Sequence, residues 1–523
     1  MMKSANGTKA EYHKQSFTVN GVIAAILVFI VVFVPLWSVN IPPLIDYPNH
    51  LTRQYIIANI SSSDYLKNFY QVKWSATPYL AMDAIVPMLA RFVSVETAGK
   101  IFLTLTLLLM ALAPLALSRV LHGRVTPIAL LGLLFIHNST VSLGFMSYLF
   151  SLGFALCLLS LWIRLRENRP WFRLVIFPVL SSLLFFSHLM GFVIYALTVC
   201  AYELGCHIEK VRSRIPRAPL FFDSAQRINL VSFGLQFCVP SVIFCIYGPS
   251  LEILVAVSRT TYGGIWRKLT VLAETFSHLI PPYSWTLDRI LYIVLPAGLI
   301  FLLATRRLKI AKQMLWPLFA ILVSFFVIPC EWLGGYGADH RLLPAVGLIL
   351  AGSLCPRAGP GKSWQVAIGL IALVIAVRVT AITVEWRKAD HEYAEYIRSF
   401  GSLTKGSKVY YAIGNAGHAI PRRRPKLFIP CLAVMKKEVY VPHLFTSANV
   451  PGLPLRYQPD YERLHMFRPG PFFQNGQSPN WKVFVPKYDY FYLTDERFFK
   501  DPVPKQLVPI YRGSHFVLYK NAR

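Results

Sequence analysis

Residues 45–53 of this chain read IDYPNHLTR and follow shortly after its first long apolar run. Asp46 stands just beyond the end of that run, where a carboxylate needs water, a partner or a function. It also precedes a predicted short helix, Pro48–Asn59, so that it is either a helix cap or a functional carboxylate. His50 lies one turn further on and is a candidate to orient Asp46 or to share a metal ion with it.

The composition is that of an integral membrane protein. The 523 residues are 55% hydrophobic with a mean hydropathy of +0.47, and only 15% are charged, against roughly 25% in an ordinary soluble domain. The formal net charge is +28. Because a polytopic membrane protein gathers Lys and Arg in short cytoplasmic loops, we assign this excess to topology and not to nucleic acid. The eight cysteines form no C-x-x-C pair, so neither a disulfide framework nor a zinc site is predicted.

Apolar runs alternate with basic loops along the chain and predict about eleven transmembrane helices. The basic N-terminus is expected to stay in the cytoplasm, and an odd number of spans then places the C-terminus outside. The predicted spans are Val19–Trp37, Ala98–Leu121, Pro127–Met146, Tyr148–Arg164, Phe172–Phe186, Leu189–Leu204, Ile228–Tyr247, Arg289–Ala304, Leu315–Leu333, a tenth helix between Arg341 and Arg357, and Trp364–Trp386.

Two long external segments, 38–97 and 248–287, interrupt this pattern within a predicted transmembrane domain over residues 1–386. The first carries Asp46 and two helices that are too short or too polar to span, Pro48–Asn59 and Tyr79–Val93. Residues 387–523 turn soluble in composition and predict an extracytoplasmic α/β domain. Its expected helices are Asp390–Phe400 and one near Lys426–Lys437, and its expected strands are Lys408–Ile413, Glu438–Val441, Tyr488–Leu493, Leu507–Tyr511 and His515–Tyr519.

A second candidate cluster, Asp339, His340 and Arg341, lies at the outer mouth of the ninth and tenth predicted helices. Ordinary loop polarity would explain it. In the functional interpretation, Arg341 presents its planar guanidinium to a phosphate, a task for which Arg is better suited than Lys. Arg259, in the second external segment, is a weaker candidate for the same role. Arg378, within the last span, is expected to snorkel to the membrane surface.

The order of these features resembles the GT-C superfamily of membrane glycosyltransferases, which use polyprenyl-phosphate-linked sugars as donors. The shared features are an acidic residue in a long first external loop, two surface helices, many further spans and an external α/β tail. The stretch His340–Pro344, HRLLP, is similar to the Arg, apolar pair and Pro that these enzymes place at the start of a late helix. Many members carry a second carboxylate beside the first, which this chain lacks around Asp46, so the use of a divalent cation is left open.

The resemblance implies an α-helical polytopic, GT-C-like fold and transfer of a sugar from a polyprenyl-phosphate carrier to an acceptor on the extracytoplasmic face. Because the chain shows no organelle signal, the expected location is a bacterial inner membrane, with an internal eukaryotic membrane as the alternative. Asp46 would be the catalytic base, and His50, Arg259, His340 and Arg341 would bind substrate. No metal ligand and no cofactor are assigned. The expected partners are the polyprenyl-phosphate sugar donor, a glycan, lipid or protein acceptor, and membrane lipids.

Two alternatives remain at this stage. A transporter or flippase of lipid-linked glycans would show interrupted helices in two related halves, and no such repeat is evident in the sequence. A polymerase or ligase of lipid-linked glycans would depend on an Arg or His in a late loop more than on an early Asp.

Overall fold

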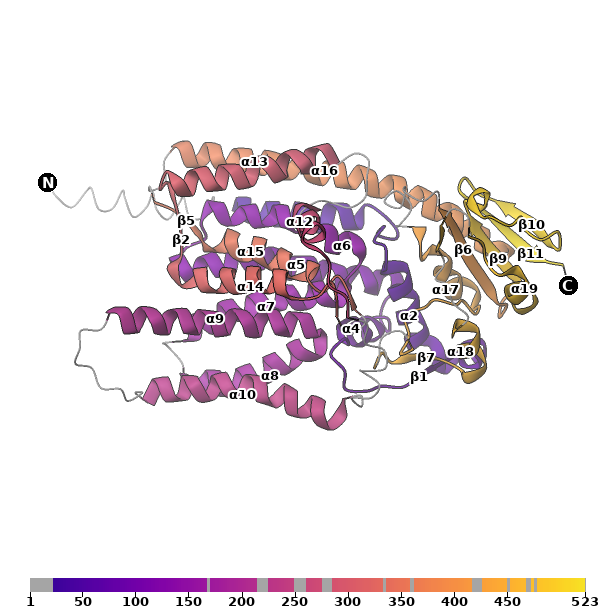
Figure 1. The fold of residues 1–523 in the computed structure, drawn as a ribbon, viewed down its shortest axis with the longest axis horizontal. Coiled ribbons are helices and arrows are strands. Elements are labelled where there is room, and N and C mark those ends of the chain that lie inside the picture. The colour runs from indigo at the N-terminus through magenta and orange to yellow at the C-terminus, as the bar shows by residue number, and fades with distance from the viewer. Residues whose placement is uncertain are drawn as a thin grey trace.

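The computed structural model describes residues 22–166, 170–213, 224–248, 260–274, 285–332, 335–357, 362–415, 426–448, 452–466, 472–474 and 477–522. A bundle of long helices occupies one end of the molecule and a β-sheet the other, with short helices between them (Figure 1). The short helices of this middle layer come mainly from the first long loop of the chain. The middle layer is therefore where the bundle meets the rest of the protein.

Apolar side chains on all sides of the long helices explain the bundle, because a helix in lipid needs no polar face. Six described helices are long and apolar enough to cross a membrane, and shorter apolar helices include Val22–Trp37 at the start of the chain. The bundle helices are α5 (Val95–His122), α7 (Met146–Leu165), α8 (Pro170–Ser187), α9 (Leu189–Ser213), α10 (Ser224–Tyr247), α13 (Trp285–Ala304), α14 (Leu315–Val327), α15 (Leu343–Ser353) and α16 (Lys362–Ser399). The protein is thus a membrane protein, and the count of eleven spans stays a prediction.

The predicted span Pro127–Met146 is wrong as a single helix. The chain forms a 3-10 helix, η2 (Pro127–Phe135), and then a separate short helix, α6 (Ser139–Leu143). Asn138 causes the break, since its side-chain oxygen accepts hydrogen bonds from the backbone N–H groups of Thr140 and Val141 and so starts a new helix. The helical period of the apolar residues continues through this break and conceals it.

Arg378 does not snorkel, contrary to the sequence prediction. Its side chain is buried in α16 and donates a hydrogen bond to the Asp288 carboxylate of α13 at 2.8 Å. It also donates to the backbone carbonyls of Leu134 and His137, at 3.1 and 2.6 Å. Burial of this charge is tolerated because a carboxylate and two carbonyl groups replace its water.

The first external segment forms both predicted surface helices, α2 (Tyr47–Asn59) and α4 (Ala81–Leu89). It also forms a third short helix, α3 (Asp64–Phe69). A buried ion pair of 2.8 Å joins Arg53 of α2 to Asp83 of α4. Both side chains are fully enclosed, which makes the pair costly to break from one side only. The two helices are therefore fixed to each other over the top of the bundle.

The C-terminal part forms a five-stranded sheet with the order β10-β11-β9-β6-β8. Strand β6 pairs in parallel with β9 and β8, and β11 pairs antiparallel with β9 and β10. The strands are β6 (Val409–Asn415), β8 (Phe472–Gln474), β9 (Tyr490–Thr494), β10 (Leu507–Arg512) and β11 (Phe516–Asn521), and the helices around them are α17 (Ala433–Lys437), α18 (Pro459–Met466) and α19 (Trp481–Phe484).

Two details of this part differ from the sequence predictions. The predicted helices Trp364–Trp386 and Asp390–Phe400 are one continuous helix, α16, which runs from the bundle toward the sheet (Figure 1). The predicted strand Glu438–Val441 contributes only an isolated bridge between Tyr440 and Lys408. No glycine or proline separates the two halves of α16, so the helical backbone continues. The polar residues between them only mark the passage of the helix from apolar to polar surroundings.

Small two-stranded sheets complete the fold and link distant segments. Strand β1 (Tyr70–Val72), from the first external segment, pairs antiparallel with β7 (Leu455–Tyr457) of the C-terminal part. The other pairs are β2 (Leu308–Ile310) with β5 (Leu354–Pro356), and β3 (Glu331–Trp332) with β4 (Gly335–Tyr336). The β1–β7 pair attaches the C-terminal part to the loop that carries Asp46.

Candidate functional site

Asp46 lies in a short connection whose backbone is held by α6. The N–H groups of Ile45 and Asp46 donate hydrogen bonds to the carbonyls of Ser142 and Leu143, at 2.9 and 3.1 Å. Asp46 occupies the N-cap position of α2, yet its side chain makes no capping hydrogen bond. The backbone of Asp46 is therefore positioned from outside α2, and its carboxylate is not used as a helix cap.

Gly144 provides the close contact between α6 and Asp46. It ends α6 with φ +88°, in the left-handed region that favours glycine. A Cβ at this position would lie 2.8 Å from the backbone nitrogen of Asp46 and 3.0 Å from its Cβ. Any side chain here would displace Asp46, so this glycine is required both by its own backbone and by its neighbour.

Arg341 is half-buried between the end of α14 and the start of α15, in the short helix η4 (His340–Leu342). Its guanidinium carbon lies 4.5 Å from the centroid of the Phe145 ring and 5.8 Å from that of Tyr148. The Tyr148 hydroxyl donates a hydrogen bond to the Arg341 carbonyl. Among the described residues, Arg341 has no carboxylate within 4.0 Å, and its buried Nε has no hydrogen-bond partner. A cation held by aromatic rings without a counter-charge is suited to receive an anion.

Asp46 and Arg341, which together are termed the candidate site, interact electrostatically without forming a direct ion pair. Burial raises the pKa of the Asp46 carboxyl to about 7, and the positive charge of Arg341 opposes that rise. Burial also lowers the pKa of Arg341, which Tyr79, Tyr148 and Asp46 counteract. The arrangement thus combines a carboxyl group poised near neutral pH with a desolvated cation.

The segment from Asn138 to Gly144 connects the surroundings of Asp46 with those of Arg341. Ser139 Oγ lies 2.6 Å from Nε2 of His340, the residue before Arg341, and burial lowers the pKa of His340 to about 4. A neutral His340 is therefore part of the support of Arg341. The same short segment accepts the backbone hydrogen bonds of Ile45 and Asp46. One rigid turn thereby fixes the separation of two residues that lie nearly three hundred positions apart.

Asp339 forms ion pairs with a helix of the second external segment, α12 (Ile265–Glu274). Its carboxylate lies 2.6 Å from Arg267 and 2.8 Å from Lys268. Burial alone would raise the pKa of Asp339, but the hydrogen bonds and charges of these two residues lower it overall. Sequence reasoning selected Arg259 as the basic residue of this segment, and Arg259 lies outside the described residues.

His50, one turn after Asp46, contacts the C-terminal part. Its ring lies 5.1 Å from that of Phe445, in the C-terminal part, and burial lowers its pKa well below the usual value. Its buried Nδ1 has no hydrogen-bond partner among the described residues. Asn49, the residue before it, exchanges hydrogen bonds of 2.9 Å with the backbones of His443 and Phe445. The start of α2 therefore follows directly on Asp46 and also contacts the C-terminal part.

Sequence reasoning did not assign Tyr79, Tyr148 or His188 to the surroundings of Arg341. Tyr79 and Tyr148 place their rings 5.0 and 5.9 Å from the His188 ring, and all three interact electrostatically with Arg341. They come from three separate segments, so no local motif could identify them. Within the described ranges, no group of three or more His, Cys, Asp or Glu side chains is arranged to hold a metal ion.

Comparison with known proteins places this geometry in a known fold. No family model matches the sequence, and no curated protein matches it. A solved structure does match: ArnT from Cupriavidus metallidurans bound to undecaprenyl phosphate. The two chains are 12% identical, with a TM-score of 0.52 over 96% of this chain and 98% of that one. This membrane protein therefore has the fold of ArnT, in agreement with the fold expected from the resemblance of its sequence features to the GT-C superfamily.

Proposed function

We propose that this protein is a membrane glycosyltransferase that moves a sugar from a polyprenyl-phosphate carrier to an acceptor hydroxyl on the extracytoplasmic face. Asp46 takes the proton of the hydroxyl, and the acceptor oxygen forms a bond to the anomeric carbon. The bond from that carbon to the phosphate oxygen breaks, and the polyprenyl phosphate leaves with the electron pair. Arg341 stabilises the negative charge that develops on the departing phosphate.

The observation that carries this proposal is the electrostatic interaction of Asp46 with an Arg341 guanidinium that has no carboxylate within 4.0 Å among the described residues. A half-buried cation without a close counter-charge is unfavourable in the free protein, and an incoming phosphate removes that penalty. The GT-C fold supports a phosphate as the anion, since ArnT was solved with undecaprenyl phosphate bound. A lipid donor reaches such a site by diffusion in the bilayer, so no nucleotide-binding loop is needed.

The carboxyl group of Asp46 supports the proposed proton transfer. A general base works best when its pKa is near the working pH, and that of Asp46 is about 7. An ordinary surface aspartate is a much weaker base. The charge of Arg341 keeps a fraction of Asp46 ionised at neutral pH, so that each residue supports the function of the other.

The C-terminal part is proposed to border Asp46 and Arg341 on the side from which the acceptor enters. Residues His443 and Phe445 contact Asn49 and His50 at the start of α2, one turn away from Asp46. We place His50 at this boundary, as a substrate-binding residue, and the unpartnered Nδ1 of its ring supports that assignment. The N-terminus is then cytoplasmic and the C-terminal part extracytoplasmic.

Binding of undecaprenyl phosphate tests the role of Arg341. Purified protein in detergent is titrated with this lipid, and binding is followed by native mass spectrometry. Arg341→Gln should weaken binding by about 10- to 100-fold, because a charge-assisted hydrogen bond is worth about 1.5–3 kcal/mol. Arg91→Gln, at an exposed position of the same external layer, is the matched control and should bind normally. Equal binding by both variants would refute the phosphate role of Arg341.

Transfer of labelled sugar from a panel of polyprenyl-phosphate sugars tests Asp46 separately. Asp46→Asn should still bind undecaprenyl phosphate and should lose at least about 100-fold in transfer rate. Asp64→Asn, at a solvent-exposed position of α3, is the conservative control and should keep full activity. An Asp46→Asn protein that transfers sugar at the normal rate would exclude the general-base mechanism, and lipid movement without transfer would favour a flippase.

A further inference from the structure

The turn between α8 and α9 lies against the first external segment, and His188 is its central residue. The backbone N–H of Leu80 donates a hydrogen bond to the carbonyl of Phe186 at 2.8 Å, and that of Leu189 donates to the carbonyl of Pro78 at 3.1 Å. These two hydrogen bonds, one on each side of His188, fix the turn to the first external segment. His188 therefore has a fixed place at the outer end of the bundle.

Aromatic rings enclose the His188 side chain. The ring of Tyr79 stands edge-on to it with the centroids 5.0 Å apart, and the ring of Tyr148 with the centroids 5.9 Å apart. His188 is only 7% exposed. The centroid of the Tyr148 ring also lies 5.8 Å from the guanidinium carbon of Arg341, and His188 interacts electrostatically with Arg341. His188 and Arg341 thus have a common neighbour in Tyr148 and belong to one group of side chains.

The two ring nitrogens of His188 have different surroundings. Nδ1 accepts a hydrogen bond of 3.0 Å from the backbone N–H of Met190, at the start of α9. Burial, and then the positive charge of Arg341, lower the pKa of His188 well below its usual value, so the ring is neutral. A neutral imidazole whose Nδ1 accepts a hydrogen bond carries its proton on Nε2. Among the described residues, that Nε2–H has no hydrogen-bond partner, and it is not fully enclosed.

We propose that the Nε2–H of His188 donates a hydrogen bond to the phosphate of the lipid carrier that binds at Arg341. A phosphate has several strong acceptor oxygens, so that one bound to a guanidinium still accepts hydrogen bonds from further donors. A neutral donor suits this place, because a second cation would have to be buried beside the like charge of Arg341. The inference rests on the proposed function for the identity of the ligand, and it adds His188 as a residue that binds this ligand.

Helix capping alone would also explain a histidine at this position, since Nδ1 satisfies a backbone N–H at the start of α9. Two substitutions separate the two roles. His188→Asn keeps a capping oxygen near the place of Nδ1 and removes the Nε2–H, whereas His188→Gln keeps an amide N–H near the place of Nε2 and gives up the cap. Capping alone predicts normal lipid binding by the Asn variant and weakened binding by the Gln variant. Phosphate contact predicts the opposite.

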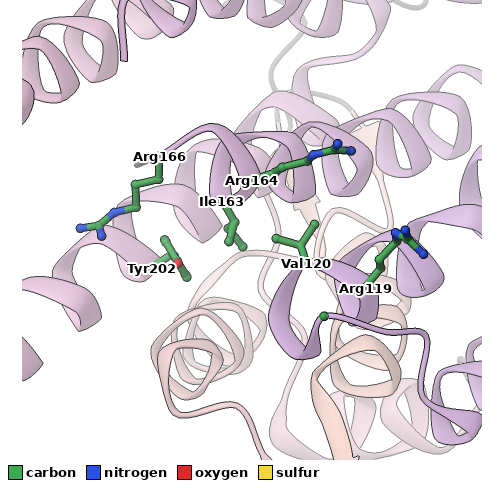
Figure 2. A pocket seen from close by; sticks show the side chains of 7 residues that line it. Arg119, Val120, Ile163, Arg164, Arg166 and Tyr202 are labelled. Carbon is green, nitrogen blue, oxygen red and sulfur yellow. The ribbon is translucent and has the colours of Figure 1, made fainter. Parts of the chain in front are cut away.

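Arginines also gather at the opposite end of the bundle, where a lipid phosphate could bind instead. A half-open hollow of about 470 Å³ lies there, lined by the ends of α5 and α7 and by Tyr202 of α9 (Figure 2). Arg164 lines this hollow from the last turn of α7, whereas Tyr148 belongs to the first turn of the same helix. The rise of an α-helix separates those two residues by about 24 Å. Arg164→Gln therefore reports binding at the hollow and not binding beside His188.

The test is a titration of the full-length protein in detergent with undecaprenyl phosphate, followed by native mass spectrometry. His188→Asn should weaken binding about tenfold, because it removes a hydrogen bond to a charged group. His188→Gln should stay within about threefold of the unaltered protein. Arg164→Gln should bind normally, as should His391→Asn, a matched control at an exposed position of α16. Undecaprenol, which lacks the phosphate, should bind equally to the unaltered protein and to His188→Asn.

Normal binding by His188→Asn, with weakened binding by Arg341→Gln in the same titration, would overturn this inference and leave the proposed function intact. Normal binding by Arg341→Gln would instead refute the proposed function. A tenfold loss of undecaprenol binding in His188→Asn would show altered packing and no phosphate contact, and a loss in Arg164→Gln would place the lipid at the remote hollow. Thermal unfolding without lipid shows which variants fold. Each His188 variant decides the question alone, because capping and phosphate contact predict opposite results for it.

Discussion

The pH dependence of sugar transfer tests both the role of Asp46 and its proximity to Arg341. With a pKa of about 7, only about one tenth of the Asp46 carboxyl groups are ionised at pH 6, and nearly all are ionised at pH 8. If Asp46 is the base, kcat/KM should fall about tenfold for each pH unit below 7 and reach a plateau above pH 8. An exposed aspartate would instead give a midpoint near pH 4.

Arg341→Gln should shift this profile, whereas a pKa of Asp46 set by burial alone would leave the midpoint unchanged. The charge of Arg341 lowers the pKa of Asp46, so removing it should move the midpoint to higher pH. An opposite charge within about 4–6 Å shifts a pKa by 1–3 units, and the two groups are more than 4.0 Å apart, so we expect a shift of about one unit.

The readout is the midpoint and not the height of the profile, which makes the test independent of weaker donor binding in the variant. Initial rates are measured with labelled polyprenyl-phosphate sugar between pH 5 and pH 9, with Asp64→Asn as the control that should keep the original midpoint. An unaltered midpoint in Arg341→Gln would refute the proximity of the two groups. A midpoint near pH 4 in the unaltered protein would refute the burial of Asp46.

Three further predictions concern stability and packing, each measured by unfolding in detergent. Gly144→Ala should lower the free energy of unfolding by about 1–2 kcal/mol, because alanine is strained in a left-handed backbone conformation. It should also lower the transfer rate about 100-fold, because its Cβ displaces Asp46. Gly123→Ala, at φ +70° with no atom within 4 Å of the added Cβ, gives the stability cost of the backbone alone. Asp46→Asn should raise the free energy of unfolding above pH 7 by at most about 4 kcal/mol. The reason is that, between pH 4 and pH 7, the folded state binds the Asp46 proton more tightly than the unfolded state does. The gain should vanish below pH 4, and a gain that persists there would contradict the raised pKa of Asp46. Arg53→Met should lower the free energy of unfolding by about 3–5 kcal/mol, because it leaves the Asp83 carboxylate buried without its counter-charge. The double variant Arg53→Met with Asp83→Leu should recover most of that loss. Equal losses in the single and double variants would contradict the buried pair.

Much of the candidate site could be predicted because charged residues are rare in this chain. A carboxylate just past an apolar run, and an arginine at the mouth of a late helix, are unusual enough to be noticed singly. Pro48 at the start of a helix and the polar residues around Asn59 likewise indicated the bounds of α2 to within a residue or so. These are properties of single residues and of their immediate neighbours.

The partners of those residues could not be predicted in the same way. Arg378 looked like a snorkelling residue until its carboxylate partner, Asp288, was found on a different helix. The basic residues that hold Asp339 are Arg267 and Lys268, which sequence reasoning passed over in favour of Arg259. A local pattern shows that a charge must be satisfied, and only the packing of distant helices shows which group satisfies it.

The sequence by itself determined that this is a polytopic membrane protein with an acidic first loop, because hydropathy and helix boundaries depend on neighbouring residues. The tertiary structure decided how that loop is used. The helix breaks at Asn138 although the apolar pattern of the sequence continues there. The Asn138 side chain caps the next helix, and this hydrogen bonding is not visible in the hydropathy. The turn that follows links the segment of Asp46 to that of Arg341. It accepts the backbone hydrogen bonds of Ile45 and Asp46, and its Ser139 side chain contacts that of His340.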